Sequence, residues 1–332
     1  MKKILIFIIV IIVSCSLYAN DKKKLIILLR YRIEKNYFSN TVSSFIKALY
    51  ENGFILGDNL EIKDFLTSTA DLKSVPEVIK VINKYKNEAD LFVTCGWISI
   101  YAREILKDTN KPQIFMPVLK SVALKLISSV KTPPHTNING VYLQYPPEKI
   151  IKIVKLILPN IINYGYIYDS RIPADTTFKE AYKKLTESKK KGIKISFFDL
   201  ANGIDKVIKM IKLKNIQAIG GIVGLFKHLK IFDKLNIPII TSLTLDIEEK
   251  DLKKIIKNTN IVAGLFNPFS YCGYHAGLMA VKILKNGEYI GDIMPIPAKQ
   301  IAFINLDAAK RLNIKIHFNA IDAVDIIIKW NF

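Results

Sequence analysis

The sequence is poor in cysteine, proline and glycine. Only 3 of its 332 residues are cysteine, which is too few for a small secreted fold held together by disulfides. Its 13 prolines and 15 glycines exclude a collagen-like or low-complexity chain. Half of the residues are hydrophobic and 23% are charged, which is the balance of a globular protein with a sizeable core.

Acidic residues are also scarce, and the net charge is therefore high. The chain has 49 Lys and Arg against 29 Asp and Glu, a formal charge of +20. The excess is mostly lysine and accompanies many Ile and Asn residues, a pattern typical of genome-wide composition bias. It permits attraction to anionic lipid, but it does not indicate binding to nucleic acid, and no nucleic-acid partner is expected.

Motifs for metal binding and catalysis are missing. The four histidines lack Cys or carboxylate partners at ligand spacing, and no G-x-S-x-G, H-E-x-x-H or P-loop phrase occurs. Gly220-Gly221-x-x-Gly224 follows a predicted strand without the dinucleotide-binding fingerprint. Tight packing, or close approach of the backbone to a ligand, explains these glycines better. We therefore expect no enzyme, no metal and no cofactor.

Residues 1–20 are predicted to be a signal peptide. Lys2 and Lys3 precede an apolar run at residues 4–13, too short to span a bilayer and typical of a secretory signal. Two cleavage sites compete. Residues 12–15 (IVSC) resemble a lipobox in which Cys15 would be lipidated, and this site is favoured; the alternative is cleavage after Ala19. Either way the protein is exported, lipid-anchored at the cell membrane or periplasmic. No later stretch is long and apolar enough to span a membrane.

The first half of the exported chain alternates strands with helices. Residues 24–30 (KLIILLR) form a continuous apolar run, typical of a strand buried on both faces. Val42, Phe45, Ile46 and Leu49 then recur with the period of one helix face. Further strands are predicted at residues 60–65, 91–95, 113–118 and 141–143, the last after a turn at Asn139-Gly140.

The same alternation is repeated in the second half. Strands are predicted at residues 164–168, 193–198, 216–223, 237–240 and 261–266, with helices between them. Each half therefore predicts a doubly wound parallel sheet flanked by helices. Two such lobes create a cleft that closes by hinge motion. Lobe 1 is expected at residues 22–142 and 266–297, and lobe 2 at residues 143–265 and 298–332.

Two phrases near the C-terminus are distinctive: residues 266–287 (FNPFSYCGYHAGLMAVKILKNG) and residues 305–316 (NLDAAKRLNIKI). Together they resemble ABC-transporter substrate-binding proteins of the tryptophan/tyrosine type, which have a type I periplasmic-binding fold. The resemblance implies a monomer that binds a small molecule, such as an aromatic amino acid, between its lobes. It also implies that the protein delivers this ligand to ABC permease subunits in the membrane and does no chemistry on it.

The sequence departs from this family's pattern at the expected cleft. Leu119-Lys120-Ser121 stands where the family usually has Thr-Asp-Pro, and residues 220–224 (GGIVG) stand where it usually has an Asp. A ligand ammonium needs an anionic partner. These departures leave open a more neutral or anionic ligand, or a chain that has lost transport function.

Candidate ligand-binding residues follow the strand ends, where open parallel sheets bind their ligands. In lobe 1, Arg32 is expected to clamp a carboxylate and Trp97 to stack on a flat ligand. Each residue also has an alternative without a ligand-binding role: Arg32 would be solvated, and Trp97 would be packed in the lobe. The full set in lobe 1 is Tyr31, Arg32, Trp97, Ser99, Lys120 and Ser121.

In lobe 2, Asp169 is the best remaining acid for a ligand ammonium, unless it pairs with Arg171. Tyr145 and Asn267 are expected near the hinge. Thr176 is expected at the start of a helix, where its hydroxyl can bind a ligand carboxylate, although Ser and Thr also cap helices for structural reasons. The full set comprises Tyr145, Asp169, Ser170, Arg171, Thr176, Ser242 and Asn267.

Two alternative functions and the state of two cysteines stay open from the residues alone. The same cleft would serve a ligand-sensing lipoprotein that signals to a receptor, or a purine-nucleoside-binding lipoprotein. Cys95 and Cys272 either form a disulfide or remain buried free thiols, and the second state is favoured.

Overall fold

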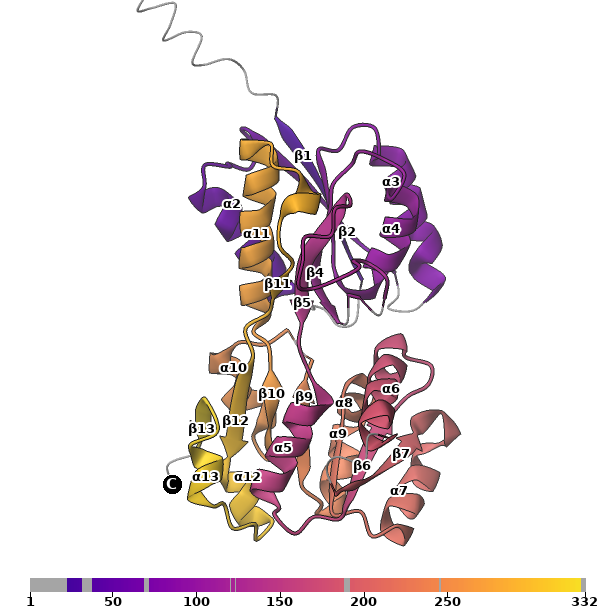
Figure 1. Ribbon diagram of the computed structural model, residues 1–332, viewed down its shortest axis with the longest axis vertical. Coiled ribbons are helices and arrows are strands. Elements are labelled where there is room, and N and C mark those ends of the chain that lie inside the picture. The colour runs from indigo at the N-terminus through magenta and orange to yellow at the C-terminus, as the bar shows by residue number, and fades with distance from the viewer. Residues whose placement is uncertain are drawn as a thin grey trace, which may run out of the picture.

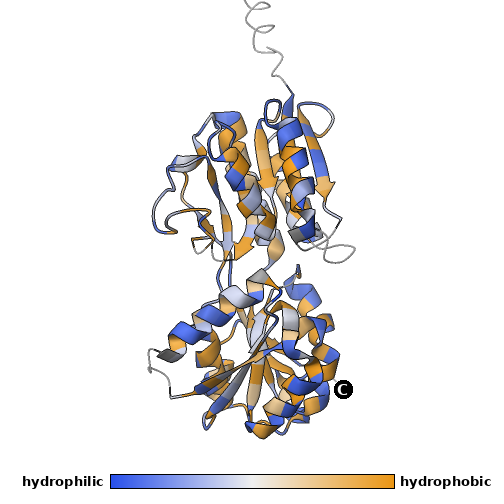
Figure 2. Ribbon diagram, turned by 90° about the vertical axis from the view of Figure 1, so that its right-hand side faces the viewer, coloured by the Kyte–Doolittle hydropathy of each residue, from blue (hydrophilic) through white to orange (hydrophobic). Residues whose placement is uncertain are grey.

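The structure is a computed structural model that describes residues 23–31, 38–68, 72–119, 121–122, 124–187, 192–244 and 246–329. The described chain forms two α/β lobes, one above the other along the long axis, joined by a narrow waist (Figure 1). The predicted fold class is confirmed. Figure 2 shows hydrophobic residues concentrated in the strands and hydrophilic residues on the outer faces of the helices. No helix in the described part combines the length and hydropathy needed to cross a membrane.

Lobe 1 is built on a parallel sheet with the strand order β11-β5-β4-β3-β1-β2. Because successive side chains of β1 alternate between the two faces, Ile26 and Leu28 join one core and Ile27 and Leu29 another. Helices α2 and α11 cover the first face, and α3 and α4 cover the second (Figure 1). The elements are β1 (Lys24–Arg30), α2 (Ser39–Glu51), β2 (Leu60–Leu66), α3 (Val75–Tyr85), β3 (Leu91–Thr94), α4 (Ser99–Leu106), β4 (Gln113–Leu119), β5 (Ile138–Leu143), α11 (Phe269–Asn286) and β11 (Ile296–Pro297).

Lobe 2 is built on a second sheet with the order β13-β12-β10-β9-β8-β6-β7. Its strands are β6 (Asn163–Tyr168), β7 (Lys194–Asp199), β8 (Ala218–Gly221), β9 (Ile239–Leu243), β10 (Ile261–Phe266), β12 (Ile301–Asn305) and β13 (Ile326–Ile328). Its helices are α5 (Pro147–Ile157), α6 (Pro173–Glu187), α7 (Ile204–Leu213), α8 (Val223–Lys227), α9 (Leu229–Phe232), α10 (Glu249–Ile256), α12 (Leu306–Arg311) and α13 (Phe318–Ile321).

One strand pair of lobe 2 departs from the predicted parallel order. Strand β12 runs antiparallel to β10. The chain leaves lobe 2 at the end of β10 and forms α11 and β11 in lobe 1 before it returns as β12. The two neighbours therefore run in opposite directions, because one leads out of the lobe and the other leads into it.

The turn predicted at Asn139-Gly140 is wrong, because both residues lie inside β5. The Asn139 amide is buried and donates to the carbonyl oxygens of Ile290 and Ile293. A Cβ atom at position 140 would lie 2.1 Å from the carbonyl oxygen of Phe115. Close packing between strands, rather than a turn, requires glycine here.

The strand predicted at residues 216–223 is shorter, since β8 ends at Gly221 and α8 begins at Val223. The glycines of the 220–224 segment pack closely against other residues, which is one of the two interpretations of this motif. A Cβ atom at Gly220 would lie 1.8 Å from the Tyr164 hydroxyl oxygen, and one at Gly224 would lie 2.6 Å from a carboxylate oxygen of Asp175.

Candidate ligand cavity between the lobes

A cavity of about 790 Å³ lies between the lobes. This volume falls in the range of small-molecule binding sites. The lining residues come mainly from the carboxyl ends of strands and the segments that follow them, as expected for open parallel sheets. They are Tyr31, Phe38, Lys73, Gly96, Trp97, Ile100, Pro117, Val118, Leu119, Leu124, Leu143 and Phe269 from lobe 1, and Asp169, Arg171, Ile172, Ala174, Thr177, Val223, Lys227, His228 and Thr244 from lobe 2.

Four aromatic side chains of lobe 1, Tyr31, Phe38, Trp97 and Phe269, form an aromatic wall. The Tyr31 ring lies 5.5 Å from the Trp97 ring and 5.2 Å from the Phe38 ring, measured between centroids. Phe38 stacks on Phe269 at 6.1 Å. These separations are those of favourable aromatic pairs. The wall therefore offers an ordered aromatic surface to a ligand in the cavity.

Gly96 makes this wall possible. It follows β3 as the first residue of a short 3-10 helix (Gly96–Ile98) and has a φ of +66°, a left-handed conformation that favours glycine. A Cβ atom at this position would lie 2.5 Å from the Tyr31 ring. Glycine thus turns the chain into the short helix that carries Trp97 and leaves room for Tyr31 beside it.

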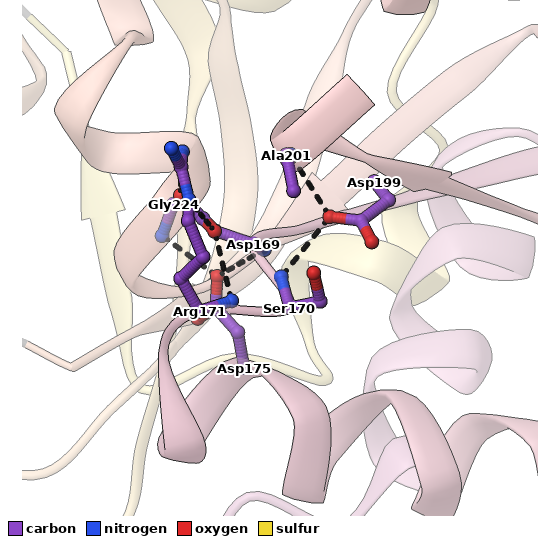
Figure 3. Close-up of polar contacts among 7 residues, drawn as sticks. All are labelled: Asp169, Ser170, Arg171, Asp175, Asp199, Ala201 and Gly224. Carbon is purple, nitrogen blue, oxygen red and sulfur yellow. Dashed lines mark hydrogen bonds and ion pairs between the residues drawn. The ribbon is translucent and has the colours of Figure 1, made fainter. Parts of the chain in front are cut away.

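The opposite side of the cavity carries charge, and there Asp169 pairs with Arg171 (Figure 3). Arg171 donates to the Asp169 carboxylate from Nε at 2.8 Å, from Nη2 at 2.6 Å and from its backbone N–H at 3.0 Å. Hydrogen bonding from Arg171 lowers the pKa of Asp169. Of the two roles weighed for Asp169, the structure shows the ion pair with Arg171.

Asp175, in the first turn of α6, fixes the position of this pair. Its buried carboxylate accepts the backbone N–H groups of Asp169 at 2.9 Å and Gly224 at 3.0 Å (Figure 3). It also accepts the backbone N–H of Val223 at 3.0 Å. Burial raises the pKa of Asp175 to about 6, although the three N–H groups oppose this shift. Asp175 thereby ties the turn after β6 to the start of α8. The signal in the sequence that could have identified Asp175 was its position two residues after Pro173, at the start of a helix.

Four of the sequence-predicted residues line the cavity: Tyr31, Trp97, Asp169 and Arg171. The predictions for Cys15, Arg32 and Lys120 lie outside the described residues. The others lie off the cavity lining, namely Ser99, Ser121, Tyr145, Ser170, Thr176, Ser242 and Asn267.

The predicted residues that do not line the cavity are buried elsewhere, exposed, or one or two positions away from a lining residue. Ser99 is buried, and its hydroxyl accepts a hydrogen bond from Thr94 Oγ1 at 2.9 Å. The Ser121 hydroxyl is buried without a hydrogen-bond partner among the described residues. Ser170 is exposed and its N–H donates to Asp199 at 3.0 Å. Thr176 and Ser242 are displaced by one or two positions from lining residues, Thr177 and Thr244.

Tyr145 and Asn267 lie in the segments that connect the lobes. The Tyr145 hydroxyl donates to the Leu243 carbonyl at 2.8 Å and accepts the N–H of Asn267 at 3.3 Å. The Asn267 amide donates to the carbonyl of Lys299 at 2.6 Å. The described chain crosses between the lobes three times, after β5, after β10 and after β11. Tyr145, Asn267 and Lys299 each lie in one of these crossings, so the bonds join all three.

Sequence reasoning missed several lining residues. Phe38 and Phe269 complete the aromatic wall, and Lys73 and Lys227 bring positive charge to the cavity. The available signals were that Lys227 comes soon after the double glycine that ends β8, and that Phe269 follows Asn267 where the chain crosses between the lobes. Neither signal separates a lining residue from a surface residue.

Nothing in the described part forms a group of three or more His, Cys, Asp or Glu placed to hold a metal ion. Cys95 and Cys272 are free and buried, so the favoured prediction for these thiols is confirmed. Burial raises the pKa of both thiols well above the ordinary range. They are therefore protonated structural residues and not nucleophiles.

Comparisons with known proteins agree with this architecture. Over 305 residues the chain is 26% identical to a tyrosine-binding protein of Clostridioides difficile (strain R20291), covering 89% of this chain and 83% of that protein. The ABC domain in complex with L-Trp from Streptococcus pneumonia has a similar fold, with a TM-score of 0.75, 20% identity, and coverage of 92% of this chain and 100% of that chain.

A second similar fold is the ligand-free, open structure of a substrate binding protein with adhesive properties from Clostridium difficile. The TM-score is 0.69, the identity is 20%, and the match covers 93% of this chain and 100% of that chain. The model of the family described as ABC transporter substrate binding protein matches residues 29–323, nearly the whole described chain. The chain therefore belongs to the ABC transporter substrate binding proteins, and it is a binding protein and not an enzyme.

Proposed function

We propose that the protein is an exported solute-binding lipoprotein of an ABC importer, and that it binds a small aromatic molecule between its lobes. The observation that carries the proposal is the aromatic wall of lobe 1 facing the charged residues of lobe 2 across one cavity. An aromatic ring stacks on Trp97 or Tyr31, and a polar group of the same ligand reaches Arg171 or Lys227. Closure about the waist would bring both sets onto the ligand.

The relatives support the aromatic part of this proposal. One is named for binding tyrosine, and one solved structure holds L-Trp. Both ligands combine a flat ring with a charged end, which is the combination that the two walls of this cavity match. The alternatives, a sensing lipoprotein and a nucleoside-binding lipoprotein, would use the same cavity.

The anchor is part of the same proposal. Residues 1–20 direct export, and Cys15 carries the lipid. Strand β1, the first described element, begins at the end of lobe 1 that is remote from lobe 2 (Figure 1). A tether attached there leaves the cavity open to ligand and both lobes available to the permease subunits. A monomer is sufficient for this task. We expect Cys15→Ala to move the protein from the membrane fraction to the soluble exported fraction, and unchanged fractionation would contradict lipidation.

Ligand binding is tested by thermal denaturation of the mature chain with aromatic amino acids, aromatic acids, nucleosides, peptides and aliphatic organic acids. A ligand at 100 times its Kd stabilises the folded protein by about 2.7 kcal/mol, a readily measured shift. Only aromatic ligands are expected to raise the Tm. Trp97→Ala should weaken their binding about tenfold or more, since stacking on Trp contributes most where it is buried.

Tyr101→Ala is the matched control, because Tyr101 packs edge-on against Trp97 at 5.7 Å but does not line the cavity. It should leave the affinity nearly unchanged. A Tm shift with nucleosides or aliphatic acids alone would contradict the aromatic proposal.

A further inference from the structure

The charged residues that line the cavity are mostly cations. Lys73 from lobe 1 and Arg171 and Lys227 from lobe 2 all line it. Among the described lining residues, Asp169 is the only carboxylate. Apart from His228, the described lining therefore carries three positively charged side chains and one negatively charged side chain.

The one carboxylate is already occupied. Both oxygens of Asp169 accept from Arg171, and only 6% of the Asp169 side chain is exposed, against 67% of Arg171. A ligand entering the cavity therefore meets the guanidinium group before it meets the carboxylate. A ligand ammonium would have to displace a two-point Arg–carboxylate pair, which is among the strongest protein hydrogen-bonding arrangements.

Asp175, the acid that holds the Asp169 backbone, offers no substitute. Asp175 is fully buried, does not line the cavity, and directs both of its oxygens at backbone N–H groups. Lys227, in contrast, lines the cavity, and none of the ion pairs found among the described residues includes it. Its positive charge acts on Asp169 and adds to that of Arg171. The site thus holds a cation for an incoming anion, while the only acid among the described lining residues is already paired.

We infer that the ligand is an aromatic carboxylate without an ammonium group beside the carboxylate, and that it binds in preference to the corresponding amino acid. The inference rests on the proposed function, since it takes the aromatic wall as the surface that binds the ring. The carboxylate is placed between Lys227 and Arg171, and the Asp169–Arg171 pair remains intact. This differs from the ligands named for the relatives, because the charges of this cavity are arranged for an anion.

Two matched ligand pairs test the inference by titration calorimetry on the mature chain. L-tyrosine is compared with 3-(4-hydroxyphenyl)propanoate, and L-tryptophan with 3-(indol-3-yl)propanoate. Within each pair the two molecules differ only by the ammonium group. We expect the acid to bind at least tenfold more tightly than the amino acid in one pair or both. Affinity for the acid should also fall as salt screens the cations.

The possible failures are distinguishable. Equal or tighter binding of the amino acids would overturn this inference and leave the aromatic proposal standing. If no aromatic compound binds, both fall, and binding of a nucleoside or an aliphatic acid would show which ligand class replaces them.

The cation assigned to the carboxylate is tested with Lys227→Met. This change keeps the apolar stem and removes the charge, so affinity for the acid should fall about five- to tenfold. Affinity for the neutral analogue 3-(4-hydroxyphenyl)propan-1-ol should change less than twofold. Lys230→Met, on the neighbouring α9 and off the lining, is the matched control and should alter neither affinity. Equal losses for the acid and the alcohol would overturn the role of the Lys227 charge.

Discussion

At the scale of single residues, Asp246 is unusual because its carboxylate bonds across the two lobes and one of its oxygens has no hydrogen-bond partner among the described residues. It lies in lobe 2 between β9 and α10 and accepts the N–H of Asn40, at the start of α2 in lobe 1, at 3.0 Å. Its second oxygen, Oδ1, is buried and has no hydrogen-bond partner among the described residues. Burial raises the pKa of Asp246 to about 6, and the nearby Glu248 adds to the shift.

This shift makes stability depend on pH. In the unfolded chain an aspartate titrates near pH 4, whereas Asp246 in the folded protein titrates near pH 6. The folded state therefore binds more protons between these values, so the contribution of Asp246 to stability falls as pH rises from about 4 to 6. Replacing it by the neutral Asp246→Asn removes this dependence.

We expect the free energy of unfolding of Asp246→Asn, relative to the parent protein, to rise by about 2 kcal/mol between pH 4 and pH 7. Urea denaturation of both proteins at several pH values measures this difference. The control is Asp58→Asn, at an exposed site, for which the difference should be flat. A flat difference for Asp246→Asn as well would contradict the burial argument.

At the scale of elements, helices α2 and α11 of lobe 1 approach each other unusually closely. A Cβ atom at Gly273 would lie 1.8 Å from the carbonyl oxygen of Thr41, and one at Gly277 would lie 2.6 Å from the Ala48 side chain. Two glycines one helical turn apart on α11 thus form the contact with α2. This helix pair also carries Phe269 of the aromatic wall.

Gly273→Ala is therefore expected to destabilise the protein. In an exposed helix the same change would stabilise by about 1 kcal/mol, because alanine has the higher helix propensity. Here the added methyl group collides with backbone, and a loss of about 2 kcal/mol or more is expected. Thermal or urea denaturation measures it. Lys282→Ala, at an exposed position of the same helix, should stay within about 0.5 kcal/mol. A stabilised Gly273→Ala variant would refute the close contact.

At the scale of the whole molecule, the two lobes are held by the three crossings and by contacts beside them. Tyr145 bonds to Leu243 and Asn267, and Asn267 bonds to Lys299. Next to them, Glu248 of lobe 2 accepts the backbone N–H of Ser270, at the start of α11 in lobe 1, at 3.0 Å and its hydroxyl at 2.5 Å. The joint is thus a set of buried and partly buried hydrogen bonds and not only a run of connecting chain.

Tyr145→Phe tests this joint. The ring stays, but the carbonyl of Leu243 and the N–H of Asn267 lose their partner in a buried place. The free energy of unfolding should fall by about 1–3 kcal/mol. Tyr50→Phe, at a tyrosine that is 68% exposed, is the matched control and should have little effect. Equal stability of the Tyr145→Phe variant and the parent would show that the Tyr145 hydroxyl does not hold the crossings together.

Much of this protein was determined by the sequence alone, because the relevant signals are local. Apolar runs and helical periodicity depend on neighbours a few positions away, and they predicted the alternating strands and helices and the two α/β lobes. The rule that ligands meet the ends of parallel strands was enough to bring Tyr31, Trp97, Asp169 and Arg171 to the cavity lining.

Only the tertiary structure decided the features that depend on distant partners. Gly140 resembled a turn residue until Phe115 of the adjacent strand was placed against it. Ser99 and Ser242 follow or end strands but lie off the cavity, since packing fixes which way each side chain points. Phe38, Lys73, Lys227 and Phe269 reach the cavity from four separate segments. The sequence left Asp169 two possible partners, a ligand ammonium and Arg171. The folded turn that Asp175 holds decided for Arg171. The physical reason is that charge recognition depends on geometry across the cavity and not on spacing along the chain.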